Sequence, residues 1–169
     1  ALTYEEETEF LNCLNQSKYE KWKPLFVFMF GTGCRVGETI GIRWEDIDLQ
    51  AGEVDINHDI TYCPRERLGF KCDYEVGPPK TVAGIRTIPL MKKLRDVLVE
   101  ERDRQDKYGI RCKAEVDGMS GFVFSNRDGQ LHKPSSINRA IKRIVDDHNN
   151  LETVRAAKEN REPVLIPYF

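Results

Sequence analysis

The sequence predicts an α+β domain that is mostly helical and contains a small antiparallel sheet of three or four strands. Two patterns support this fold class. Apolar residues recur at helical spacing in three segments, residues 4–14, 92–108 and 133–145. Apolar and polar residues alternate in four shorter segments bounded by turn residues, at 53–57, 59–62, 71–76 and 85–90.

The composition of the 169 residues is that of an ordinary globular chain, with 40% hydrophobic and 32% charged residues. This length is sufficient for one domain with its own core. No apolar run approaches the roughly 20 residues that span a bilayer, and residues 1–15 carry acids where a signal peptide carries bases. We therefore expect a cytoplasmic protein that does not enter a membrane.

The charge is unevenly distributed along the chain. Residues 1–60 carry 5 basic and 12 acidic groups, whereas residues 61–114 carry 13 basic and 8 acidic groups. The middle third is therefore either a basic face for an anionic partner or an ordinary solvated surface. The five cysteines form no Cys-x-x-Cys pair and no zinc-like spacing with the three histidines, so we expect no metal and no cofactor.

Two helices are expected at the start of the chain. Thr3 and Glu6 have the spacing of a capping box, which predicts a helix over residues 4–14. Pro24 then opens a second helix, and the run Leu-Phe-Val-Phe-Met-Phe at residues 25–30 is apolar on all sides. This second helix should lie in the core and form a stiff wall against which Arg35 is set.

A Gly-Thr-Gly turn at residues 31–33 should end that helix, because glycine adopts backbone angles that other residues avoid. Arg35 comes next, at the start of a short helix, and Glu38 lies one turn later, where it can pair with Arg35 or cap the turn. A guanidinium fixed at such a corner offers two planar donors to a phosphate or carboxylate. The alternative is a buried Arg35–Glu38 pair that only stabilises the corner. The spacing fits neither a Rossmann fingerprint nor a Walker loop.

The segment 77–90 connects two of the expected strands. Two prolines stiffen the approach to Lys80, and Val-Ala-Gly at 82–84 is short enough for a hairpin turn. We therefore expect Lys80 at the end of a β-hairpin, followed by Arg86 on the next strand. A solvated loop lysine is the alternative interpretation.

The remaining elements are predicted in chain order. Residues 92–108 predict an amphipathic helix ended by Gly109, and residues 111–121 a loop. Residues 121–130 predict a short buried strand and a turn, and a helix then runs from Lys133 through Val145, with a second helical piece over 151–161. Near the start of the helix, Lys133, Ser135 and Arg139 can contact phosphate, or they are ordinary capping and surface residues.

The stretch Gly-Thr-Gly-x-Arg-x-x-Glu-x-x-x-x-x-Trp-x-Asp-Ile-Asp at residues 31–48 resembles the first signature box of the tyrosine recombinases, the phage integrase family. The whole chain is similar to integrases of conjugative transposons. The resemblance implies the catalytic-domain fold of that family. It also implies that Arg35 binds the scissile DNA phosphate, with Glu38 in a supporting role. Pro-Lys-Thr followed by Arg-x-Ile-Pro-Leu resembles the family's hairpin, which implies that Lys80 is the general acid and that Arg86 orders the hairpin or contacts phosphate.

The family's His-x-x-Arg box and nucleophilic tyrosine are not found in residues 1–169. Tyr168 stands in an Ile-Pro-Tyr-Phe setting that is typical of a core segment, so we do not assign it as the nucleophile. The chain is therefore expected to be a partial catalytic domain, truncated at its C-terminal end, without the family's N-terminal DNA-binding modules. Since cleavage needs a nucleophile and a full set of cations, this polypeptide alone should be inactive.

The expected function of the whole protein is site-specific recombination, in which DNA strands are cut and rejoined through a 3′-phosphotyrosine intermediate. The resemblance implies double-stranded DNA at transposon ends and target sites as partner, and self-assembly on DNA as a tetramer. Two alternatives remain open at this point. One is a non-catalytic DNA-binding or assembly module with the same fold, and the other is an α+β domain that binds a small phosphorylated ligand through Arg35.

Overall fold

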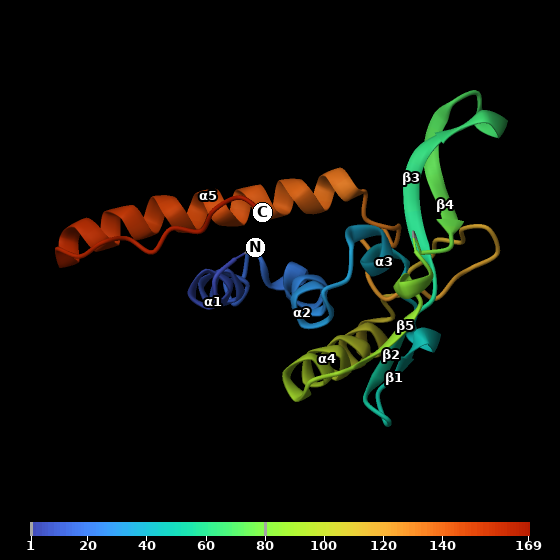
Figure 1. Ribbon diagram of the computed structural model, residues 1–169, viewed down its shortest axis with the longest axis horizontal. Coiled ribbons are helices and arrows are strands. Elements are labelled where there is room, and N and C mark those ends of the chain that lie inside the picture. Colours follow the sequence, from blue (N-terminus) through green and yellow to red (C-terminus); the bar gives the residue numbers. More distant parts are fainter. Residues whose placement is uncertain (1, 80) are drawn as a thin grey trace. The chain divides into compact units, whose positions relative to one another are not determined.

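The computed structural model describes residues 2–79 and 81–169, without the side chains of Arg67 and Val82. The chain divides into two compact units, residues 27–134 and residues 1–26 together with 135–169. The helices are α1 (Tyr4–Cys13), α2 (Lys23–Thr32), α3 (Val36–Gly41), α4 (Lys92–Tyr108) and α5 (Pro134–Glu159) (Figure 1). The strands are β1 (Ile47–Asp48), β2 (Glu53–Ile56), β3 (Asp59–Arg65), β4 (Lys71–Gly77) and β5 (Arg86–Pro89).

The unit of residues 1–26 and 135–169 is helical. The expected capping box begins α1, since the Thr3 backbone N–H donates to Glu6 Oε2 at 2.7 Å and the Glu6 N–H donates to Thr3 Oγ1 at 3.2 Å. Phe10 is fully buried and meets the Phe26 ring edge-on, with 5.3 Å between ring centroids. The core of this unit thus forms where α1 and the first turn of α2 meet.

Helix α5 is one continuous helix of 26 residues. The prediction of a separate helical piece over 151–161 is wrong, because no glycine or proline stands between Pro134 and Glu159 to interrupt the helix. The C-terminal segment runs back along the helix: the Asn149 side-chain amide donates to the Ile166 carbonyl at 2.9 Å, and the Ile166 N–H donates to Asn149 Oδ1 at 2.8 Å. The polar side chain of Asn149, in the middle of α5, therefore binds this segment.

The unit of residues 27–134 contains two antiparallel sheets in its described residues. One has the strand order β1-β2-β5, and the other is the hairpin of β3 and β4. The predicted hairpin around residue 80 is wrong, because β4 pairs with β3 while β5 pairs with β2. The strand positions themselves agree closely with the alternating patterns in the sequence. Lys80 lies outside the described residues.

Two glycines that the sequence placed in one turn have different roles. Gly33 has a φ of +64° and ends α2, as expected. Gly31 lies inside α2, where an added Cβ would come within 3.0 Å of Leu94 Cδ2. Gly31 therefore allows α2 and α4 to pack closely, and the turn itself depends on Gly33.

The segment 121–130 is buried but is not a regular strand. Phe122, Val123 and Phe124 are at most 5% exposed. The β-bridges of this segment are single ones among the described residues, Arg43 with Phe122 and Ser125 with Leu131. The predicted burial is confirmed, and the predicted strand is reduced to isolated bridges.

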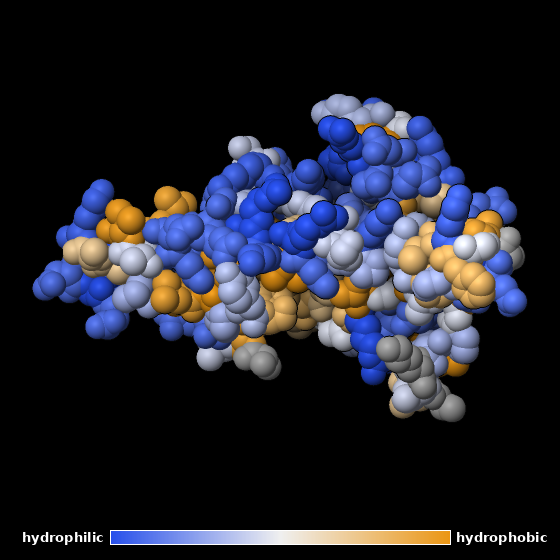
Figure 2. All heavy atoms as spheres, turned by 90° about the horizontal axis from the view of Figure 1, so that it is seen from above, coloured by the Kyte–Doolittle hydropathy of each residue, from blue (hydrophilic) through white to orange (hydrophobic). Residues whose placement is uncertain are grey.

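The surface is dominated by hydrophilic side chains on the face shown in Figure 2, where apolar residues form small separate patches. None of the helices in the described part of the chain combines the length and apolar character needed to cross a bilayer.

Candidate functional site

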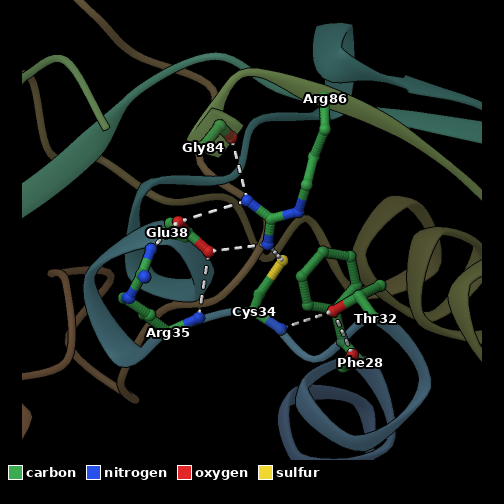
Figure 3. A network of polar contacts seen from close by, with 7 residues as sticks. All are labelled: Phe28, Thr32, Cys34, Arg35, Glu38, Gly84 and Arg86. Carbon is green, nitrogen blue, oxygen red and sulfur yellow. Dashed lines mark hydrogen bonds and ion pairs between the residues drawn. The ribbon is translucent and has the colours of Figure 1, made fainter. Parts of the chain in front are cut away.

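Arg35 occupies the position immediately before α3 and is bound there by Glu38. The Arg35 backbone N–H donates to Glu38 Oε2 at 3.0 Å, and its guanidinium Nη1 donates to Glu38 Oε1 at 3.1 Å (Figure 3). The two roles that the sequence left open for Glu38 are thus combined, since the carboxylate both caps the helix and pairs with Arg35.

Arg86 reaches the same carboxylate from β5. Its Nη2 donates to Glu38 Oε2 at 2.9 Å and its Nη1 donates to Oε1 at 3.3 Å, while Nη1 also donates to the Gly84 carbonyl at 2.8 Å (Figure 3). Sequence reasoning did not find this pair, because 48 residues separate its members. The structure therefore brings three predicted site residues together, Arg35, Glu38 and Arg86, which we call the Glu38 cluster.

The burial of these side chains is unequal. The Glu38 side chain is 0% exposed, whereas the side chains of Arg86 and Arg35 are 29% and 54% exposed. Burial alone would raise the pKa of Glu38, but the hydrogen bonds from Arg86 and Arg35 outweigh it and hold the pKa below its usual value. The interaction with Glu38 raises the pKa of Arg86. One anionic carboxylate thus faces two guanidinium groups, and the cluster keeps a net positive charge.

Close packing fixes the backbone of this corner. An added Cβ at Gly37 would lie 2.7 Å from the Ile60 carbonyl oxygen in β3, so α3 rests directly on the strand. Thr32 Oγ1 donates to the Phe28 carbonyl at 2.7 Å and accepts from the Cys34 N–H at 3.3 Å, which ties the end of α2 to the turn. The arginine is therefore held before any ligand arrives, and its exposed half leaves guanidinium N–H donors for an anion.

The other predicted phosphate-contacting residues are divided between the two units. Lys133 belongs to the unit of residues 27–134, where its Nζ lies 5.2 Å from the centroid of the Tyr62 ring. Ser135 and Arg139 belong to the other unit, and Arg139 Nε donates to the Ser135 carbonyl at 3.2 Å. Lys80, the predicted general acid, lies outside the described residues.

Sequence reasoning missed a basic cavity in the unit of residues 1–26 and 135–169. The cavity measures about 250 Å³ and lies between the segment 18–22 and the first turns of α5. Four cations line it, and we call them the α5 basic cluster: Lys18, Lys21, Arg139 and Arg143. Lys18 is ion-paired with Asp147 at 2.5 Å. The only possible signal in the sequence was the helical spacing of Arg139 and Arg143.

Within residues 2–79 and 81–169, no group of three His, Cys, Asp or Glu side chains is placed to hold a metal ion. All five cysteines are free thiols. Burial raises the pKa of the Cys34 thiol, which also accepts a hydrogen bond from Arg86 Nη2 at 3.6 Å. Cys34 is thus a neutral packing group beside the Glu38 cluster.

Known proteins resemble this chain over most of its length. Residues 1–158 match the phage integrase family. A XerC-like tyrosine recombinase of Caldanaerobacter subterraneus subsp. tengcongensis is 30% identical over 135 residues, covering 76% of this chain and 34% of that protein. The transposase from transposon Tn916 of Enterococcus faecalis is 26% identical over 170 residues, covering 99% of this chain and 38% of that protein.

Solved structures show the same fold. The integrase of transposon Tn1549, in complex with transposon right end DNA, matches with a TM-score of 0.75 at 22% identity, covering 89% of this chain and 45% of that one. The crystal structure of XerA recombinase matches with a TM-score of 0.57 at 15% identity, covering 86% of this chain and 41% of that one. The chain spans little more than a third of the length of the two curated relatives. Its sequence match and its fold agree, and the chain belongs to the phage integrase family of tyrosine recombinases.

Proposed function

We propose that these residues are part of the catalytic domain of a site-specific DNA recombinase that integrates and excises a mobile element. Relatives named as a transposase from transposon Tn916, as prophage integrase IntR and as ICEBs1 integrase support this proposal. The proposed partner is double-stranded DNA at the ends of the element and at its target site, on which several copies assemble as a tetramer inside the cell. The Tn1549 integrase structures contain DNA, which supports the choice of partner.

The observation that carries the proposal is the unequal burial of the Glu38 cluster. Glu38 is fully buried, and it fixes a half-exposed Arg35 at the start of α3. A phosphodiester that is attacked at phosphorus gains negative charge on its non-bridging oxygens. A guanidinium that is already held in place stabilises this charge without having to lose rotamer freedom during the reaction. We assign Arg35 to the scissile phosphate, and Glu38 and Arg86 to positioning it.

The proposed chemistry is transesterification. A tyrosine hydroxyl attacks the phosphorus atom and loses its proton, a 3′-phosphotyrosine bond forms, and the bond from phosphorus to the 5′ oxygen breaks. We assign Lys80 as the acid that protonates the leaving 5′ oxygen. The tyrosine and the His-x-x-Arg residues of the family are not among residues 1–169, so we expect a polypeptide of these residues alone not to cleave DNA.

The weaker phosphate contacts are assigned to Lys133, Ser135 and Arg139. The α5 basic cluster supports this for Arg139, since Lys21 and Arg143 share its cavity. Contacts of this kind fix the register of a protein on the DNA backbone without reading bases. The affinity that they provide should fall as the salt concentration rises.

The proposal is tested with the full-length protein and a nicked DNA duplex that traps the covalent intermediate. We expect Arg35→Ala to lower the cleavage rate about 10²- to 10³-fold, the usual effect of removing one donor to a developing oxyanion. Arg127→Ala is the matched control, because the Arg127 side chain is 95% exposed in the same unit. Cleavage by Arg35→Ala at the wild-type rate would remove Arg35 from the site.

Lys80 is tested with a second substrate in which sulfur replaces the leaving 5′ oxygen. A thiolate leaves without prior protonation, because its conjugate acid is far stronger than an alcohol. Lys80→Ala should therefore cleave the ordinary substrate slowly and the sulfur substrate at the wild-type rate, while Arg35→Ala stays slow on both. If the full-length protein binds DNA and forms no covalent product, the non-catalytic DNA-binding module is the better assignment.

A further inference from the structure

A second cavity, in the unit of residues 27–134, shares no lining residue with the Glu38 cluster. It measures about 660 Å³ and lies between the segment 44–50 and one side of α4, within the unit of residues 27–134. This volume is in the range of ligand-binding clefts, roughly 300 to 1,000 Å³. The family assignment gives this groove no role.

The floor of the groove is apolar and fixed. Ile47 and Leu49 are 9% and 8% exposed, and Val99 of α4 lines the groove beside them. The indole of Trp44 also lines the groove, and its Nε1 donates to Gln105 Oε1 at 3.1 Å. The indole orientation is therefore set before a ligand binds, which favours the insertion of an apolar side chain.

Two cations of α4 line this groove without a carboxylate partner among the described residues. Arg95 and Arg102 are seven residues apart, which places them two turns or about 10.5 Å apart along the helix. The Arg95 guanidinium donates to the Gln50 carbonyl at 3.5 Å, and neither Arg95 nor Arg102 has an ion pair with any residue that the structure describes.

Other cations of α4 have carboxylate partners on the same helix. Lys92 pairs with Asp96 at 2.6 Å. Arg104 pairs with Glu101 at 2.7 Å. Arg95 and Arg102 therefore differ from Lys92 and Arg104, whose charge is already balanced on the helix.

The two carboxylates at the rim of the groove, Glu45 and Asp48, already have partners within the protein. Glu45 is ion-paired with Arg43. Asp48 Oδ1 accepts the backbone N–H groups of Gln50, at 2.8 Å, and of Ala51, at 2.7 Å. The groove therefore has free positive charge on its α4 side, an apolar floor, and carboxylates on the opposite rim that are bound to other groups.

We infer that this groove binds a segment of a partner protein in which an apolar side chain is flanked by two carboxylates. The apolar side chain contacts Trp44 and Val99, and the carboxylates pair with Arg95 and Arg102. A segment in the polyproline II conformation has three residues per turn and rises about 3.1 Å per residue, so carboxylates three residues apart share one face and match the spacing of the two arginines. A DNA backbone fits less well, because its phosphates would meet the carboxylates of Glu45 and Asp48 and would leave the apolar floor uncovered.

The test measures the fluorescence anisotropy of a labelled peptide, Gly-Glu-Phe-Leu-Glu-Gly, titrated with the full-length protein. The matched probe replaces both glutamates with glutamine. We expect the acidic peptide to bind at least fivefold more tightly than the neutral one. The double variant Arg95→Glu with Arg102→Glu should lower the affinity for the acidic peptide at least tenfold. Lys93→Glu, a charge reversal on the same helix outside the groove, should change it less than twofold.

Four results would overturn the inference. The acidic and neutral peptides could bind equally well, or the double variant could bind the acidic peptide like the wild type. A labelled 20-base-pair duplex could instead lose affinity in the double variant while the peptide does not, which would make the groove a DNA contact. Sedimentation of the wild type and the double variant completes the test, since loss of a dimer without any peptide binding would assign the groove to a second copy of this chain.

Discussion

The two compact units hold their cations by opposite means. In the unit of residues 27–134, the fully buried carboxylate of Glu38 binds Arg35 and Arg86. In the other unit, the α5 basic cluster surrounds an open cavity, and its ion pair joins two partly exposed side chains, Lys18 and Asp147. A buried counter-charge fixes a cation in one geometry, as a reacting phosphate requires. Exposed cations keep their rotamer freedom, which suits contacts to the DNA backbone that depend on charge alone.

The largest expected effect comes from removing the buried charge. Glu38→Gln should lower the free energy of unfolding of the unit of residues 27–134 by about 3 kcal/mol, because two guanidinium groups lose their shared carboxylate. Urea unfolding followed by Trp44 fluorescence, in a Trp22→Phe background, measures this. Glu45→Gln is the control and should cost less than about 1 kcal/mol, because the Glu45 side chain is 68% exposed. If the two substitutions lowered the free energy of unfolding equally, the burial of Glu38 would make no difference to its contribution to stability.

The next largest effect tests the packing that holds the corner. In Gly37→Ala the new Cβ would lie 2.1 Å from Asp59 Oδ1 and 2.7 Å from the Ile60 carbonyl oxygen, so α3 must move away from β3. We expect a loss of about 2 kcal/mol in the same unfolding assay and a lower DNA cleavage rate. Gly77→Ala is the matched control, since an added Cβ there meets no atom within 4 Å. A Gly37→Ala variant as stable as Gly77→Ala would show that the corner is adaptable.

A pH titration of thermal stability tests the lowered pKa of Glu152. Hydrogen bonds from Arg161 and from the Val164 N–H lower the pKa of Glu152 to about 2, and the pKa of Glu38 is also lowered. A lowered pKa gives stability that is complete above the unfolded value of 4.5 and disappears as the pH falls through the folded value. The difference in Tm between wild type and Glu152→Gln should therefore be constant from pH 7 to 5 and shrink between pH 4.5 and 2. A difference that grows on acidification would contradict the assignment.

The smallest effects are expected in the α5 basic cluster. Lys21→Ala and Arg143→Ala should each weaken DNA binding by the full-length protein about threefold, and each should reduce the slope of log affinity against log salt by about 1. The free energy of unfolding should change by less than about 0.5 kcal/mol. Arg155→Ala, on the same helix outside the cavity, serves as the control. An unchanged salt slope would exclude the cavity from the DNA contact.

Local signals in the sequence predicted the start of α1 and much of the corner that holds Arg35. The Thr3–Glu6 capping box, the end of α2 at Gly33 and the Arg35–Glu38 spacing all depend on residues within one or two turns, and the structure has each of them. The Glu38–Arg86 pair could not be predicted, because it depends on the pairing of β5 with β2. The same long-range pairing overturned the hairpin expected around residue 80.

The continuous helix α5 shows a second reason why part of the fold could not be predicted from the sequence. The run Asp-Asp-His-Asn-Asn at residues 146–150 is typical of a helix boundary when it is judged by propensity. Tertiary contacts override this preference: Asp147 binds Lys18 and Tyr19, and Asn149 binds the backbone of Ile166. The α5 basic cluster was missed for a related reason, since residues 18–22 and 136–143 meet only in the folded unit.

The unbroken course of α5 makes its register sensitive to changes in length. One residue inserted after Val145 would rotate every later side chain by about 100° around the helix axis. Asp147 would then turn away from Lys18 and Tyr19, and His148 from Cys13, so the later turns of α5 would lose their attachment to residues 13–19. The same insertion in the loop of residues 111–115 would leave every helix in register. Deletions and insertions should therefore accumulate in that loop and be excluded from the middle of α5.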